Sequence, residues 1–276
     1  MPSLGSSYSS IGKSVRLSRI LDERGTLVFA FDHWFEHGPS DFSADRLDPR
    51  TILEKVVGAG VDAVMLTPGD ARLFADIWAG RTALIVKVTG KTSLRPERER
   101  LLQSPIGSVE DAVRLGADAV AATVYWGSPM EDVMLERWIA IREAAEMYGL
   151  PVLQLAYPRG PSIRNRYELD IVLYGVRAAV QVGADLIKTY YTGSQASFAK
   201  VVEAASGVPV MMSGGLKREK MVDFLRDLKA VREAGAIGAV VGRNIFQSRD
   251  IERATQLCKA VLTGRASPED AAEGLL

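Results

Sequence analysis

A short phrase that recurs along the chain constrains its fold more than any other feature. The phrase stands at Gly60-Val61-Asp62-Ala63-Val64, Gly116-Ala117-Asp118-Ala119-Val120, Gly183-Ala184-Asp185-Leu186-Ile187 and, more loosely, Gly235-Ala236-Ile237-Gly238-Ala239-Val240. Glycine favours the left-handed conformation that ends a helix, and the aliphatic run after it is typical of a parallel strand buried on both faces. The repeat therefore predicts alternating helices and parallel strands.

Further apolar runs complete a set of eight predicted strands. They are Leu27–Phe31, Ala63–Leu66, Ala83–Val88, Ala119–Val124, Val152–Ala156, Leu186–Lys188, Val210–Met212 and Ala239–Val241. Helical periodicity lies between them, for example over 129–148 and 170–182. We therefore predict an α/β fold, a (β/α)₈ TIM barrel with a parallel eight-stranded barrel. An open doubly wound sheet is the rival, but no dinucleotide-binding glycine fingerprint supports it.

The chain of 276 residues suits one barrel domain. We expect an N-terminal arm or capping segment over 1–25, the catalytic barrel over 26–265 and a C-terminal tail over 266–276. The segment 89–107, which carries Lys91, Arg95, Arg98 and Arg100, is too long for a simple turn. It is predicted to be a lid or an intersubunit loop, with a solvated charged loop as the alternative.

Composition excludes several classes of function. The 34 basic and 34 acidic residues balance, so no global field favours nucleic acid or an anionic membrane. The single Cys258 excludes an intrachain disulfide framework, and no signal-peptide pattern or long apolar run is present. We expect a cytoplasmic protein with no nucleic-acid or membrane partner.

Polar residues at the carboxyl ends of the predicted strands are the first candidates for chemistry. Lys188 should share the face of Leu186 and point into the barrel mouth. Desolvation there would lower the pKa of its amine, as a nucleophilic lysine requires. A lysine that reaches out to solvent is the alternative.

Two further charged residues stand near this point. Lys87 lies inside the apolar run Leu84-Ile85-Val86-Lys87-Val88, and a permanent cation there would depress the pKa of the second lysine. Asp32 would neutralise one lysine or orient a substrate hydroxyl, unless it only forms a structural salt bridge.

Two glycine-containing loops predict a phosphate site. Ser213, Gly214 and Gly215 follow the seventh strand, and Gly242 and Arg243 follow the eighth. Barrels commonly bind phosphate with backbone amides of these loops, and Arg243 would add a fixed charge. Ordinary turns are the alternative.

The segment His33-Trp34-Phe35-Glu36-His37 matches an inverted zinc-protease pattern. That pattern requires a helix, and Gly38-Pro39 leaves little room for one here. We therefore expect no metal site.

Five motifs, in order along the chain, carry a family resemblance. They are Phe31-Asp32-His33-Trp34-Phe35-Glu36-His37-Gly38-Pro39, Ala156-Tyr157-Pro158-Arg159-Gly160, Ile187-Lys188-Thr189-Tyr190-Tyr191-Thr192-Gly193, Ser213-Gly214-Gly215 and Gly242-Arg243-Asn244-Ile245-Phe246-Gln247. From about Leu27 to Gln247 the chain resembles the archaeal-type class I fructose-bisphosphate aldolases, Schiff-base enzymes of the DeoC-like superfamily.

The resemblance implies a role for each matching residue. Lys188 would form the Schiff base, Tyr157 would transfer protons and Asp32 would orient substrate hydroxyls. Lys87 and His37 would contact substrate, while Ser213, Gly214, Gly215, Gly242 and Arg243 would hold the phosphate of the dihydroxyacetone phosphate portion. No metal or organic cofactor is implied. The partners implied are a phosphorylated sugar and further copies of the chain, often in a decamer.

Related barrels keep other functions open. Aminodideoxyheptulosonate synthases and the thiolase acting on phosphorylated autoinducer-2 share these motifs, and a non-catalytic phosphosugar-binding barrel is a third hypothesis. Two departures from the family bear on specificity, because Trp34 stands where a glycine is usual and Leu155 stands where a tryptophan is often found. The pair is predicted either to exchange volume across the acceptor pocket or to alter the choice of aldehyde.

Overall fold

The computed structural model describes residues 8–273, and in that part of the chain eight parallel strands close into a barrel. Around the barrel the strands are β1 (Thr26–Phe31), β2 (Ala63–Leu66), β3 (Ala83–Lys87), β6 (Ala119–Trp126), β7 (Val152–Pro158), β8 (Leu186–Thr189), β9 (Val210–Ser213) and β10 (Gly238–Val241). Each predicted run lies on one of these strands, except that the run Ala83–Val88 extends one residue past β3. The predicted (β/α)₈ barrel is confirmed.

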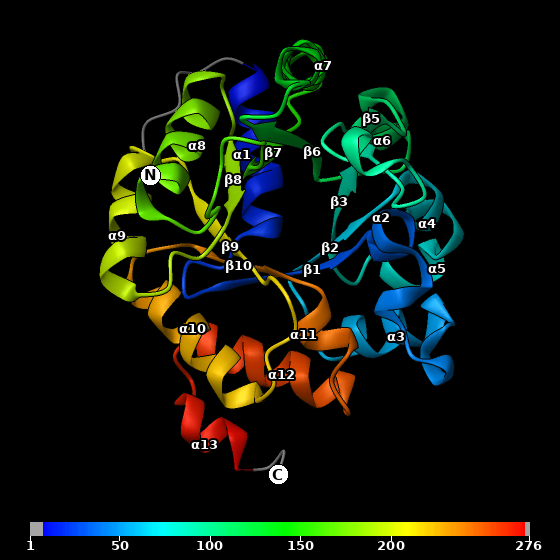
Figure 1. Cartoon of the computed structure of the whole chain (residues 1–276). Helices are drawn as coiled ribbons and strands as arrows, with labels where there is room; N and C mark the ends of the chain where they lie inside the picture. Colours follow the sequence, from blue (N-terminus) through cyan, green and yellow to red (C-terminus); the bar gives the residue numbers. More distant parts are fainter. Residues whose placement is uncertain (1–7, 274–276) are drawn as a thin grey trace.

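Helices surround the barrel and pack against its two ends (Figure 1). They are α1 (Tyr8–Ile20), α2 (His33–His37), α3 (Pro49–Gly58), α4 (Pro68–Leu73), α5 (Ala75–Trp78), α6 (Val109–Arg114), α7 (Glu131–Met147), α8 (Leu169–Gln181), α9 (Gln195–Ala204), α10 (Met221–Glu233), α11 (Arg243–Phe246), α12 (Ile251–Leu262) and α13 (Pro268–Ala272). The helices predicted over 129–148 and 170–182 correspond to α7 and α8.

The recurring phrase works as its residue types predict. Its glycines have positive φ, for example 84° at Gly60 and 82° at Gly183, so they end the preceding helices. The aspartates then accept hydrogen bonds from a backbone N–H at the start of a neighbouring strand. Asp62 accepts from Leu27 at 2.7 Å, and Asp185 accepts from Val152 at 2.9 Å. These carboxylates therefore fasten adjacent strands at the amino-terminal end of the barrel.

Basic side chains neutralise the same carboxylates. Lys13 of α1 lies 2.9 Å from Asp185, Arg19 of α1 lies 3.1 Å from Asp118, and Lys259 of α12 lies 2.6 Å from Asp62. The helix α1 therefore packs at the amino-terminal end of the barrel, opposite the carboxyl ends where a barrel carries its active site.

The segment between β3 and β6 folds back on itself. Its short strands β4 (Thr89–Gly90) and β5 (Ser104–Pro105) pair antiparallel, with the 3₁₀ turn η3 (Glu97–Glu99) between them. Lys91 and Gln103 are buried at its base, whereas Leu94 at its tip is 95% exposed. The alternative of a solvated charged loop is therefore wrong for the two ends of the segment, where Lys91 and Gln103 lie. Two further 3₁₀ turns, η1 (Gly38–Asp41) and η2 (Ala44–Arg46), follow α2.

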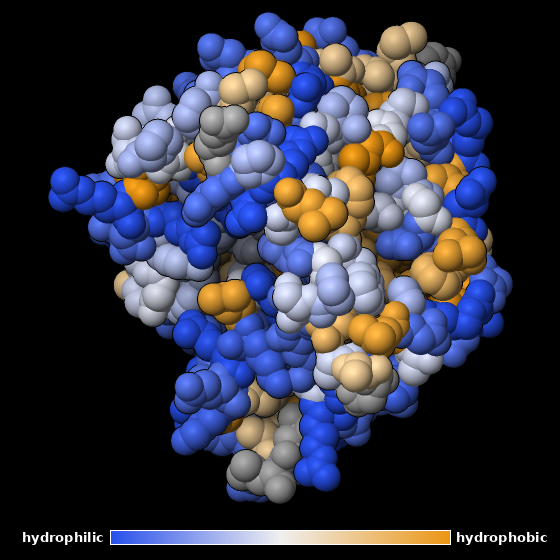
Figure 2. All heavy atoms as spheres, turned by 45° about the vertical axis from the view of Figure 1, so that its right-hand side comes forward, coloured by the Kyte–Doolittle hydropathy of each residue, from blue (hydrophilic) through white to orange (hydrophobic). Residues whose placement is uncertain are grey.

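On the face drawn in Figure 2, apolar side chains form small separate groups among hydrophilic ones. The aliphatic and aromatic side chains of the strands are instead packed inside, and Leu27, Val64, Leu84 and Ile187 are fully buried. None of the helices between residues 8 and 273 combines the length and the apolar character that crossing a bilayer requires.

Candidate active site

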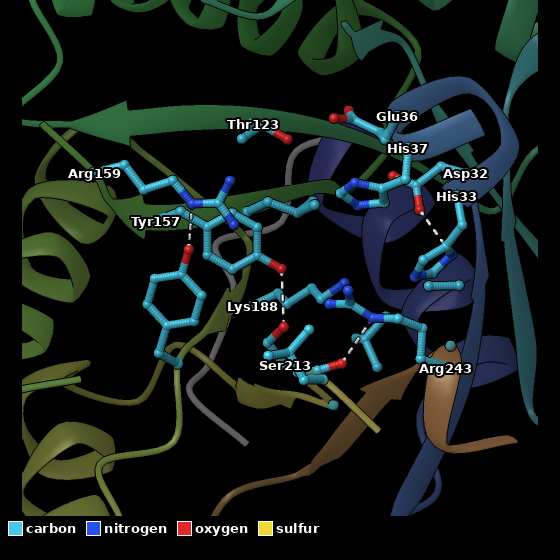
Figure 3. Close-up of a pocket in the computed structure, with 18 of the residues that line it drawn as sticks. Asp32, His33, Glu36, His37, Thr123, Tyr157, Arg159, Lys188, Ser213 and Arg243 are labelled. Carbon is cyan, nitrogen blue, oxygen red and sulfur yellow. Dashed lines mark hydrogen bonds and ion pairs between the residues drawn. The ribbon is translucent and has the colours of Figure 1, made fainter. Parts of the chain in front are cut away.

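A cavity of about 220 Å³ opens at the carboxyl ends of the strands. All ten residues predicted for the site line it: Asp32, His37, Lys87, Tyr157, Lys188, Ser213, Gly214, Gly215, Gly242 and Arg243. They come from strands or loops spread around the barrel, because parallel strands bring their carboxyl ends to one edge. Figure 3 shows Lys188 between Tyr157 on one side and Arg243 on the other.

Lys188 is a buried amine that faces the cavity. It lies on β8 in register with Leu155 of β7 and Met211 of β9, and its side chain lines the cavity together with Leu155. No carboxylate in the described residues lies within ion-pair distance of its amine. Burial lowers the pKa of Lys188 to about 8, with Lys87 and Arg243 acting in the same direction and Asp32 opposing them. A substantial fraction is therefore the neutral, nucleophilic amine near neutral pH.

Lys87 has the opposite environment. Its amine donates to Asp32 at 2.5 Å and to Glu36 at 2.7 Å. Burial alone would favour the neutral amine, but these two carboxylates outweigh it and raise the pKa of Lys87. The ammonium in turn holds the pKa of Asp32 below its usual range despite the burial of that carboxyl. Of the two lysines, Lys87 is thus a permanent cation, whereas Lys188 has a lowered pKa and supplies the neutral amine.

Tyr157 is a buried phenol beside the lysine. Its hydroxyl lies 3.0 Å from the hydroxyl of Ser213, and its ring stacks on Tyr190 with centroids 4.6 Å apart. The Lys188 amine lies 6.0 Å from the centre of the Tyr157 ring. Burial raises the pKa of Tyr157 to about 12, while Ser213 and Arg159 act in the opposite direction. Tyr157 is therefore protonated at neutral pH and has a hydroxyl proton to donate.

The predicted phosphate loops lie side by side. Gly214 donates its amide to the carbonyl of Val240 at 2.9 Å, and Arg243 donates to the carbonyl of Gly215 at 3.2 Å. Gly215 has a φ of 65°, and a Cβ at Gly242 would overlap the His33 ring. Glycine is therefore needed at both turns. The Gly214 amide already donates to Val240 and is not free for an anion. Among the predicted phosphate-binding residues, this leaves Ser213, Gly215, Gly242 and Arg243.

The expectation that Gly38-Pro39 leaves little room for a helix over His33 to His37 is wrong. Residues 33–37 form the one-turn helix α2, and the two imidazole rings lie 5.9 Å apart. Helix geometry there is permitted because Gly38, with a φ of 71°, ends the turn before Pro39. Burial lowers the pKa of His33 to about 3. Within residues 8–273 no group of three or more His, Cys, Asp or Glu side chains is arranged to hold a metal ion.

The predicted exchange of volume between Trp34 and Leu155 is also wrong. Leu155 lines the cavity, but Trp34 does not. Trp34 stacks instead on Phe42, with ring centroids 4.6 Å apart, and Phe42 stacks on Phe246. The α2 turn carries the Trp34 ring away from the cavity and into this aromatic stack.

The two positions should consequently respond differently to substitution. We expect Leu155→Trp to lower kcat/KM for a six-carbon ketose by at least roughly tenfold, because a large ring would fill much of the cavity. Trp34→Gly should keep the substrate preference but lower the free energy of unfolding by roughly 2–4 kcal/mol. Kinetics with two ketoses of different length and urea denaturation would measure both. Altered specificity in Trp34→Gly would contradict this assignment.

Several cavity residues received no role from the sequence. Glu36 is buried beside Lys87, and the buried Gln103 donates to Glu36 at 3.0 Å and to the Tyr125 hydroxyl at 2.7 Å. Arg159 stood in a quoted motif; its guanidinium donates to the Tyr190 hydroxyl at 2.5 Å and lies 5.2 Å from the centre of the Tyr157 ring. For Arg159, its place in a motif with Tyr157 could have indicated a role in the site. No sequence feature indicated such a role for Gln103.

A closed β/α barrel whose strand-end cavity contains a buried lysine beside a phenol, with an arginine and two glycine-containing loops opposite, defines the class of Schiff-base aldolases. The family model described as "DeoC/LacD family aldolase" matches residues 26–248. The chain belongs to this aldolase family, whose members are lyases.

Similar proteins within this family are fructose-bisphosphate aldolases. A class 1 fructose-bisphosphate aldolase of Thermoproteus tenax is 40% identical over 91% of this chain and 95% of its own length. A class 1 fructose-bisphosphate aldolase of Halobacterium salinarum is 34% identical over 89% of this chain and 93% of its own length. A solved archaeal fructose-1,6-bisphosphate aldolase, whose catalytic lysine is covalently bound to the carbinolamine intermediate of the substrate, is 38% identical, with a TM-score of 0.85 over 91% of this chain and 100% of that one.

Proposed function

We propose that the protein is a class I fructose-bisphosphate aldolase, which cleaves fructose 1,6-bisphosphate to dihydroxyacetone phosphate and glyceraldehyde 3-phosphate or catalyses the reverse condensation. The observation that carries this proposal is the buried Lys188 amine, which faces the cavity and has no ionic partner among residues 8–273. The names of the similar proteins support the same reaction. Such a reaction belongs to glycolysis and gluconeogenesis.

The first chemical step forms the iminium. The neutral Lys188 amine attacks the C2 carbonyl carbon of the open-chain ketose, and its proton passes to the carbonyl oxygen to give the carbinolamine. Tyr157 then donates its phenolic proton to the C2 hydroxyl, which leaves as water while the nitrogen lone pair forms the C=N bond. Arg159, beside the Tyr157 ring, stabilises the resulting phenolate.

The iminium is the electron sink for cleavage. The Tyr157 phenolate accepts the proton of the C4 hydroxyl, the C3–C4 bond breaks, and its electron pair forms the enamine as the aldehyde leaves. Tyr157 next protonates C3, and water hydrolyses the iminium, which returns the proton to the phenolate and frees the Lys188 amine. Asp32 orients the substrate hydroxyls throughout. The protein groups end the cycle as they began it.

The charges around the cavity suit a ketose with a phosphate at each end. Arg243, with Ser213 and the Gly215 and Gly242 loops, would bind the phosphate on C1. Arg159 and Arg243 lie on opposite sides of Lys188 in Figure 3, and Arg166 also lines the cavity. We assign the phosphate on C6 to this second cationic region.

The direct test is a product assay. Purified protein incubated with fructose 1,6-bisphosphate should release equal amounts of dihydroxyacetone phosphate and glyceraldehyde 3-phosphate, with the same rate in chelator because the iminium is the electron sink. Product formation only with an acyl or ketol acceptor would favour the transferase alternative. Phosphosugar binding without turnover would favour the non-catalytic one.

Arg243→Ala should mainly weaken binding of phosphorylated substrates. A hydrogen bond to a charged group contributes about 1.5–3 kcal/mol, so KM for fructose 1,6-bisphosphate should rise roughly 10- to 100-fold while kcat changes little. The slow reaction of unphosphorylated fructose is the internal control and should be unchanged. Equal losses with both substrates would show that Arg243 does not bind phosphate.

Further expectations from the sequence remain predictions about this enzyme. We propose that residues 26–265 form the catalytic unit, that the protein acts in the cytoplasm, and that it assembles as a homo-oligomer. Sedimentation analysis of the purified chain would determine the number of subunits.

A further inference from the structure

Glu36 has no part in the steps above, yet it is among the most connected groups of the cavity. It lies on α2 and is 6% exposed. Its Oε1 accepts from Lys87 at 2.7 Å and from Gln103 at 3.0 Å, and its Oε2 lies 3.6 Å from the Lys91 amine. A buried carboxylate with this many donors is fixed in one orientation.

Two of these donors belong to the segment 89–107. Lys91 and Gln103 stand at its two ends, next to the paired strands β4 and β5, and both reach the same carboxylate. A third contact comes from Ser93, whose hydroxyl donates to the backbone carbonyl of Glu36 at 2.6 Å. Glu36 is therefore the point at which this segment is attached to α2 at the cavity.

The same carboxylate restrains the ion pair of the reacting centre. Lys87 lies between Glu36 and Asp32, and the backbone N–H of Glu36 donates to the carbonyl of Asp32 at 3.0 Å. With two carboxylates sharing the Lys87 ammonium, neither takes its whole charge. Asp32 thus keeps hydrogen-bonding capacity for a substrate hydroxyl.

We propose that Glu36 is a positioning residue of the aldol cleavage: it centres Lys87 between two carboxylates, so that Asp32 stays available to the substrate, and it fastens the segment 89–107 beside the cavity. The proposal rests on the proposed aldolase function. If Glu36 is neutral, Lys87 is balanced by Asp32 alone and the base of the segment loses its charged anchor.

The charges around Glu36 and Lys188 determine how the loss of the Glu36 charge should change the pKa of Lys188. Glu36 faces Lys87 of β3, Lys91 of the segment, and Asp32 and His37 at the ends of its own helix. Lys188 faces Asp32, Lys87, Arg243 and Glu36. Since the Glu36 carboxylate favours the Lys188 ammonium, its neutralisation should lower the pKa of Lys188 further. The acid limb of Schiff-base formation should then move to lower pH, which a purely structural role would not cause.

The test compares Glu36→Gln, the conservative Glu36→Asp and the matched control Glu97→Gln, which neutralises an exposed carboxylate of the same segment. For Glu36→Gln we expect kcat for fructose 1,6-bisphosphate to fall roughly 10- to 100-fold with KM within about threefold of wild type. Amide exchange over residues 91–103 should accelerate at least roughly tenfold. Glu36→Asp should recover part of kcat, and Glu97→Gln should match wild type.

The measurements separate the possible failures. Wild-type kcat and an unmoved acid limb in Glu36→Gln would overturn the positioning role. Faster exchange with unchanged kcat would show that the segment does not assist the reaction and would also overturn it. If Glu36→Gln unfolds, the proposal then depends on Glu36→Asp, which must show the lowered kcat with normal KM. Absence of borohydride trapping in wild type would instead refute the proposed aldolase function, and amide exchange would still report on the attachment.

Discussion

Lys188→Met should abolish aldolase activity, with turnover lowered by roughly 10⁴–10⁶-fold, the loss expected when a nucleophile that forms the covalent intermediate is removed. Methionine keeps an unbranched apolar stem in the barrel but has no amine. Borohydride added with dihydroxyacetone phosphate should inactivate wild type and leave Lys188→Met unlabelled. Peptide mass mapping should place the reduced adduct on Lys188.

The pH dependence of this labelling follows from the geometry of the site. Because burial lowers the pKa of Lys188 to about 8, the neutral amine increases about tenfold per pH unit below that value and levels off above it. The trapping rate should have the same profile. Lys200→Met, which removes an exposed lysine of α9, is the matched control and should be labelled as wild type. An adduct on Lys87 would exchange the roles of the two lysines and contradict the central assignment.

The barrel could be predicted because local signals agreed along the chain. Each strand is short and aliphatic, and each repeated glycine needs the positive φ that ends a helix, as at Gly60 and Gly183. The function of the repeated aspartates could not be predicted. Their partners, such as Leu27 for Asp62, lie on neighbouring strands that only the closed sheet brings within 2.7 Å.

The site residues at strand ends could be predicted for a topological reason. A polar side chain near the carboxyl end of a buried strand lies at the mouth of the barrel when it is on the inward face, which is where Lys87, Lys188 and Ser213 lie. Residues that reach the cavity from other segments gave a weaker signal. Gln103 belongs to the long segment before α6, and nothing in its neighbours distinguishes it from a surface glutamine.

Errors came where one turn of backbone decides the direction of a side chain. The sequence indicated no helix after Asp32, but Gly38 allows one turn to close, and this turn directs Trp34 to Phe42 and Glu36 to Lys87. The missed turn matters for the proposed chemistry, because it places Glu36 in the cavity lining and Trp34 outside it.

Tyr157→Phe should lower kcat by roughly 10²–10⁴-fold, the usual contribution of a positioned acid/base, while KM stays close to that of wild type. Phenylalanine keeps the ring that stacks on Tyr190 at 4.6 Å, so the substitution isolates the hydroxyl. Its loss removes the proton that assists departure of water from the carbinolamine and the phenolate that accepts the C4 hydroxyl proton.

The control and the matching intermediate make this prediction specific. Tyr174→Phe changes a phenol that is 74% exposed and should leave kcat unchanged. In Tyr157→Phe, rapid quenching without reductant should show the carbinolamine accumulating on Lys188, because its formation needs only the amine, whereas its dehydration needs the Tyr157 proton. Near-normal turnover in Tyr157→Phe would refute the acid/base role. A slow variant that accumulates no intermediate would place Tyr157 before amine attack and would require another residue to assist the loss of water.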